Sequence, residues 1–100
     1  MRRADVFEYI LGSHRVRILI VSADPYNPRR ATYLLLLGPD SETPSRKAFV
    51  PTGTADAVQG TVDVTRLRPL VQENLGARLA RLSPTTMRSV DAALAAYLGL

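Results

Sequence analysis

Apolar residues fall in short runs along most of the chain and in a helical stripe near its end. The run over residues 16–21 is almost continuously apolar, which is typical of a strand buried on both faces. The run over residues 31–37 contains four consecutive leucines, which alone would suit a helix, but the prolines on either side leave too little room for one and favour a strand. Residues 61–64 alternate apolar and polar, as a half-buried strand does, and the segment continues to residue 71 with a proline at position 69. Shorter strands are predicted at residues 6–10 and 48–50. Segments rich in proline, glycine and polar residues separate the strands: 11–14, 24–28, 38–45 and 52–59.

The last segment carries the signals of a helix. Ser83 is a favourable N-cap, because its hydroxyl can accept from an N–H of the first turn, and Pro84 suits the first helical position. The apolar positions that follow recur with a helical period: Met87, Val90, Leu94 and Leu98. We expect Leu94, Leu98 and the neighbouring Tyr97 to pack in the core or in a dimer interface.

Composition narrows the classes of function. The chain has 100 residues and a net charge of +4, so we expect one domain over residues 1–100 and an anionic partner such as nucleic acid or an acidic peptide. It has no cysteine and a single histidine, His14, which excludes thiolate chemistry and a multi-histidine metal centre. We predict no metal site and no cofactor.

The sequence also bears on location. No apolar run is long enough to span a bilayer, and Asp5 and Glu8 interrupt any signal-peptide core. These features favour a cytoplasmic protein without a membrane partner.

Several short motifs follow one another along nearly the whole chain. They are Ala4-Asp5-Val6, Ile18-Leu19-Ile20-Val21-Ser22, Asn27, Phe49-Val50-Pro51, Gly60-Thr61-Val62, and Leu82-Ser83-Pro84 leading through Ala93-Leu94 to Leu98-Gly99-Leu100. Their order resembles the MazF/PemK toxins, in which Ala4 stands where a glycine is usual. The resemblance implies an α+β, mainly β fold: a small SH3-like barrel of antiparallel strands, shared with CcdB, and a C-terminal helix. It also favours a strand over residues 75–82, whose leucine spacing fits a helix equally well.

The same resemblance implies a function. Proteins of this family are toxins of type II toxin–antitoxin systems, and they act as sequence-specific, metal-independent endoribonucleases on single-stranded RNA. They are homodimers, and an acidic, partly disordered antitoxin neutralises them. The net positive charge of the chain fits both an mRNA substrate and an acidic antitoxin as partners.

The resemblance also suggests where the site lies. The family's catalytic pair is an arginine before a proline at the start of the buried strand, and a threonine or serine after the next strand. Val16-Arg17 stands in place of Arg-Pro, so Arg15 or Arg17 is the candidate for stabilising the scissile phosphate, with His14 assisting proton transfer. Strand alternation places the two arginines on one face. The hydroxyl candidates are Ser41 and Thr43. The candidates for a phosphate-tracking rim are Arg29, Arg30, Arg46 and Lys47, with Tyr26 or Tyr33 as an aromatic stacking platform.

Two other functions fit the sequence. One is a protein of the same fold that has lost catalytic activity and serves to bind an antitoxin or to act in co-repression. The absence of the Arg-Pro pair and the shifted position of the catalytic threonine or serine favour this alternative. A gyrase inhibitor like CcdB is the second alternative, since those toxins use residues of the C-terminal helix, and Tyr97 is an aromatic residue in that helix.

Overall fold

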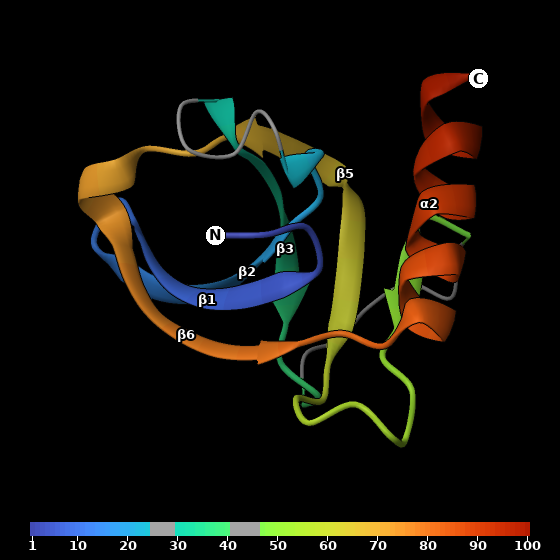
Figure 1. Ribbon diagram of the computed structural model, residues 1–100, viewed down its shortest axis with the longest axis horizontal. Helices are drawn as coiled ribbons and strands as arrows, with labels where there is room; N and C mark the ends of the chain where they lie inside the picture. The colour runs from blue at the N-terminus through green and yellow to red at the C-terminus, as the bar shows by residue number, and fades with distance from the viewer. Residues whose placement is uncertain (25–29, 41–46) are drawn as a thin grey trace.

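The computed structural model describes residues 1–24, 30–40 and 47–100. Within these residues, six antiparallel strands form one curled sheet in the order β4-β5-β3-β2-β1-β6, and one long helix, α2, packs beside β4 and β5 (Figure 1). The elements are β1 (Asp5–Leu11), β2 (His14–Ile20), β3 (Thr32–Leu37), β4 (Phe49–Pro51), β5 (Thr61–Pro69), the 3-10 helix η2 (Gln72–Asn74), β6 (Leu75–Arg81) and α2 (Pro84–Leu98). The predicted α+β, mainly β class is confirmed.

Two apolar clusters lie on opposite faces of the sheet, and β2 and β3 contribute to both. On β2, Leu19 belongs to the cluster under α2, whereas Ile18 and Ile20 belong to the other. On β3, Leu34 and Leu36 belong to the cluster under α2, and Tyr33 and Leu35 belong to the other cluster. This burial on both faces explains the nearly continuous apolar runs, because each side chain of these strands enters one core or the other.

The β1–β2 hairpin is tighter than the sequence suggested. Leu11 and His14 are paired as the last residues of the two strands, so the turn itself consists of Gly12 and Ser13. Gly12 has φ +64°, a left-handed conformation that costs glycine little. His14 therefore begins β2, whereas the sequence placed it in the turn.

The segment after η2 is a strand, as the family resemblance favoured. β6 pairs with β1, and this pairing makes β6 one edge of the sheet. Leucine spacing alone could not decide this, because the pairing partner lies more than sixty residues away in the sequence.

Helix α2 begins as predicted and ends beyond the core. Ser83 caps it by accepting from the main-chain N–H of Thr86 at 3.2 Å, and Gly99 ends it in a left-handed conformation. Met87 and Val90 are buried, but Tyr97 and Leu98 are 54% and 50% exposed. The expectation that these two residues pack in the core is wrong for the single chain, because the last turns extend past the sheet (Figure 1). A dimer interface stays a prediction for them.

A buried carboxylate ties the β4–β5 loop to the start of α2. Asp56 accepts from the main-chain N–H groups of Gly53 and Ser83, each at 2.7 Å, and from the Thr86 hydroxyl at 2.5 Å. Burial raises the pKa of Asp56, but the hydrogen bonds from Thr86, Ser83 and Gly53 outweigh it, so the net pKa is lowered. The loop and the helix N-terminus are thereby fixed to each other.

Candidate functional site

A cleft of about 450 Å³ opens where β2 begins and β3 ends. We call it the β2–β3 cleft. Its lining residues come from four strands and the residue after β3: Glu8, Arg15, Val16, Arg17, Leu35, Leu36, Leu37, Gly38 and Leu79. Three of the nine are ionisable, and leucines provide most of the remaining wall. The arrangement offers cationic donors beside an apolar surface.

Strand pairing brings the ionisable groups of the cleft together. Arg17 lies directly opposite Glu8 on β1 and opposite Leu36 on β3. Arg15 lies two residues earlier on β2, so its side chain leaves the same face as that of Arg17. His14 is exposed, lies on the other face of β2 from the two arginines, and does not line the cleft. The structure therefore joins the two predicted arginines and separates them from the predicted histidine.

The two arginines differ in what they contact. The Nη2 of Arg17 donates to the carbonyl oxygens of Leu37, at 3.1 Å, and Gln59, at 2.9 Å. Gly60 makes room for this group, since a Cβ there would lie 2.8 Å from the same nitrogen and 2.1 Å from the Leu37 oxygen. Arg17 thus joins the end of β3 to the loop before β5.

Arg15 is exposed, and its side chain forms no hydrogen bond or ion pair with any described residue. Its donors are available to a ligand in the cleft. A guanidinium in this state can set several N–H groups against the oxygens of a phosphate.

The other predicted site residues are not brought to this cleft by the described part of the chain. Ser41, Thr43, Tyr26, Arg29 and Arg46 lie outside the described residues. Arg30 is exposed just before β3, and Lys47 lines a separate groove between β4 and α2. Tyr33 is buried in β3, so the prediction that it offers a stacking platform is wrong. Among the residues that the structure describes, no three acidic or histidine side chains gather as a metal site would require, and no helix has the length and apolar character to span a bilayer.

Comparison with solved structures places this geometry in a known fold. One similar structure is an endoribonuclease from a mycobacterial species, solved in complex with its cognate antitoxin. The match has a TM-score of 0.90 and 27% sequence identity, and it covers 100% of this chain and 96% of that chain. A second mycobacterial endoribonuclease matches with TM-score 0.88 and 26% identity, over 100% of this chain and 92% of that one. MazF in a MazE–MazF complex of Deinococcus radiodurans matches with TM-score 0.81 and 17% identity, over 100% and 96% of the two chains. The chain has the MazF fold. No family model and no curated protein matches its sequence.

The β2–β3 cleft also contains a residue that the sequence did not single out as functional. The sequence marks Glu8 only as a charge that interrupts a possible signal-peptide core, yet it lines the cleft beside both arginines. The sequence does contain one indication of this position. Glu8 alternates with Phe7 and Tyr9, which are buried, so its side chain lies on the opposite face of β1 from theirs. The sequence did not reveal that this face would meet Arg17.

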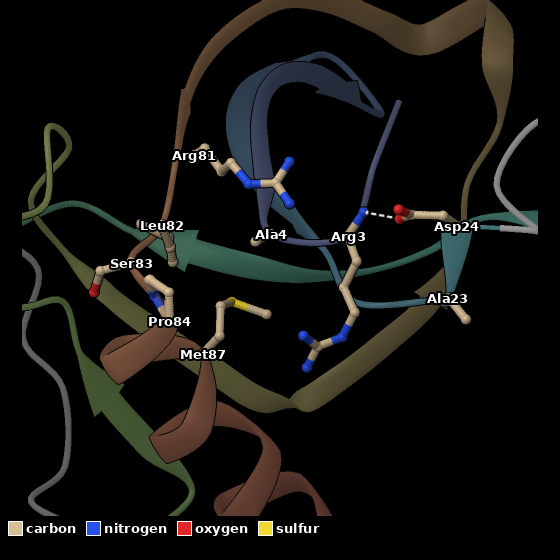
Figure 2. Close-up of a pocket in the computed structure, with 9 residues that line it drawn as sticks. All are labelled: Arg3, Ala4, Ala23, Asp24, Arg81, Leu82, Ser83, Pro84 and Met87. Atoms are coloured by element: carbon tan, nitrogen blue, oxygen red, sulfur yellow. Dashed lines mark hydrogen bonds between the residues drawn. The ribbon is translucent and has the colours of Figure 1, made fainter.

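A larger cavity, of about 700 Å³, lies on this MazF fold between the N-terminal segment, β6 and α2. Figure 2 shows Arg3 turning its main-chain nitrogen to Asp24, at 2.7 Å, and its guanidinium toward α2. That guanidinium pairs with Asp91 of the helix, and the hydrogen bond from the Arg3 main chain lowers the pKa of Asp24. On the other side, Arg81 pairs with the buried Asp5 at 3.5 Å. The charged groups of this cavity hold the N-terminal segment in place.

Ala4, within this segment, has an unusual backbone conformation. Its φ is +79°, while its main-chain N–H donates to Ile20 at 2.8 Å and its carbonyl accepts from Leu82 at 2.9 Å. A residue with a Cβ is strained there, and the position is the one at which the MazF/PemK resemblance expects glycine.

Proposed function

We propose that this protein is the toxin of a type II toxin–antitoxin pair and that it cleaves single-stranded RNA as an endoribonuclease. The proposal rests on Arg15 in the β2–β3 cleft, whose side chain has no partner among the described residues. The chain that carries it matches an endoribonuclease over its whole length at 27% identity. The site thus combines a phosphate-binding group with a fold known in RNA-cleaving enzymes.

The chemistry that suits this cleft is transesterification. The RNA supplies its own nucleophile: its 2′-oxygen bonds to the adjacent phosphorus while the bond from phosphorus to the 5′-oxygen breaks. The charge that develops on the phosphorane oxygens needs preorganised donors, and the Arg15 guanidinium can provide them. Arg17 contributes by fixing the end of β3 beside that site.

The proposal includes two protein partners: an antitoxin, and a second copy of this chain in a homodimer. Two of the three solved structures described above are complexes with an antitoxin, which supports an antitoxin as partner here. The net charge of +4 suits an acidic antitoxin segment as well as RNA, and a cytoplasmic location agrees with an mRNA substrate. Tyr97 and Leu98 are exposed apolar groups that a homodimer could cover.

The test is cleavage of single-stranded RNA by the purified protein. We expect specific fragments from the wild type and a rate at least about 100-fold lower for Arg15→Ala. Arg88→Ala, which removes an exposed arginine of α2, is the matched control and is expected to cleave normally. Full activity of the Arg15→Ala/Arg17→Ala double variant would overturn the assignment.

A non-catalytic binding protein is the second candidate. The contacts of Arg17 favour it, because a nitrogen engaged by two carbonyl oxygens is a poorer phosphate ligand than a free one. This function predicts that RNA or an acidic antitoxin peptide binds to the protein and that the RNA stays intact over hours of incubation.

A further inference from the structure

Glu8 is one of the residues that line the β2–β3 cleft. It lies midway along β1, is half-buried, and stands directly opposite Arg17. Among the described residues that line the cleft, it is the one carboxylate, and no histidine accompanies it. Any proton transfer by a side chain of this lining near neutral pH therefore falls to Glu8.

Within the described residues, the fold does not use the Glu8 carboxylate. It forms no hydrogen bond or ion pair with any residue in the described ranges, and the nearby Arg17 donates to Leu37 and Gln59. Asp5, three residues earlier on the same strand, behaves differently: it is buried and holds Arg78 at 3.1 Å and Arg81 at 3.5 Å. A half-buried carboxylate without such a role is available for chemistry.

The backbone beneath Glu8 is held in place by a bulge in β6. Phe7 pairs with Arg78 and Tyr9 pairs with Leu75, so two residues of β6 face the single residue Glu8. One of them is Gly76, where a Cβ would lie 3.1 Å from both the Cβ and the carbonyl oxygen of Glu8. Bulges of this kind often re-aim a side chain beside an active site.

We propose that Glu8 is the general base of the cleavage reaction, an inference that rests on the proposed ribonuclease function. Its carboxylate takes the proton of the RNA 2′-hydroxyl as the 2′-oxygen bonds to phosphorus. The bond from phosphorus to the 5′-oxygen breaks, that oxygen takes a proton from water, and Arg15 holds the phosphorane oxygens. The products are a 2′,3′-cyclic phosphate and a 5′-hydroxyl, and Glu8 returns its proton to solvent.

The test compares Glu8→Gln and Glu8→Asp with the wild type on one single-stranded RNA substrate. Glu8→Gln keeps the size of the side chain, and we expect its single-turnover rate to fall by about 100-fold or more, with RNA affinity and melting temperature changed little. Glu8→Asp keeps a carboxylate and is expected to retain more activity than Glu8→Gln. Glu73→Gln, in η2 and outside the cleft, removes the same charge and is expected to cleave normally.

The rate–pH profile separates a base from a residue that only shapes the cleft. The charged side chains on the strands beside Glu8 are Arg15 and Arg17 on β2 and Arg78 and Arg81 on β6, and arginines stay charged throughout the range. If Glu8 is the base, the acid side of the rate–pH profile should differ between the wild type and Glu8→Gln, whose amide cannot accept the proton. A wild-type rate for Glu8→Gln, or an unchanged profile shape, would overturn the role of Glu8 while leaving the ribonuclease function intact. A wild type that cleaves no RNA would overturn both.

Discussion

Arg17 reaches across the sheet to Gln59, whose carbonyl oxygen accepts from its Nη2 at 2.9 Å. With the second bond, to Leu37, this contact makes Arg17 a link between β2, the end of β3 and the loop before β5. Arg15, two residues away, has no such partner within the described ranges. Two arginines that look equivalent in the sequence therefore have different roles.

Replacing each arginine by alanine should separate these roles. Arg17→Ala leaves two carbonyl groups without their donor, and we expect the free energy of unfolding to fall by about 1–2 kcal/mol. Arg15→Ala should change it by less than about 0.5 kcal/mol, because the side chain is exposed and contacts none of the described residues through a hydrogen bond or ion pair. Urea unfolding of both variants measures the difference, and equal losses of stability would contradict it.

The close approach at Gly60 gives a second prediction. Gly60→Ala would place a Cβ 2.1 Å from the Leu37 carbonyl oxygen, a backbone atom that cannot move aside cheaply. We expect a loss of about 2–3 kcal/mol or more in unfolding free energy and lower occupancy of the Arg17 contacts. Gly12→Ala is the control: its Cβ would meet nothing within 4 Å, so the cost should be only about 1 kcal/mol, from the left-handed φ. Equal effects of the two substitutions would show that the packing at Gly60 is looser than described.

Ala4→Gly should stabilise the protein. At φ +79°, glycine relieves strain that alanine bears, and we expect a gain of about 0.5–1 kcal/mol after the lost methyl burial and the larger chain entropy of glycine. Thermal unfolding checks this. Ala80→Gly is the control, because it removes a methyl group of similar burial from β6, where no residue has a left-handed φ. We expect this substitution to lower the stability of the protein. A loss of stability in Ala4→Gly as large as in Ala80→Gly would contradict the assignment of strain.

The Asp56 link predicts a dependence of stability on pH. Because the pKa of Asp56 is lowered in the folded state, its contribution is fully present above the pKa of an unfolded aspartate, about 3.9, and is lost as the pH falls through the lower folded value. We expect Asp56→Asn to cost about 1–3 kcal/mol at pH 7 and progressively less in acid. Urea unfolding from pH 7 to pH 2 measures this, with the exposed Asp40→Asn as control. A cost that stays constant with pH would be inconsistent with an ionised Asp56.

The sequence predicted those features that depend on neighbouring residues. The N-cap at Ser83, the turn at Gly12 and the two-sided burial of β2 follow from local residue types and alternation. Features set by distant partners could not be predicted in this way. The role of Arg17 depends on carbonyl groups brought from β3 and from the loop before β5, and that of Glu8 on its register with β2 and on a bulge in β6. The exposure of Leu98 depends on where the sheet ends beneath α2, which helical spacing does not reveal.

Analysis of the RNA ends produced by the purified protein tests the central claim most directly. We predict that single-stranded RNA incubated with the wild type in a metal chelator yields fragments with a 2′,3′-cyclic phosphate on one side of each cut and a 5′-hydroxyl on the other, and that Arg15→Ala yields almost none. RNA that stays intact with the wild type, or fragments that carry a 5′-phosphate, would contradict the account.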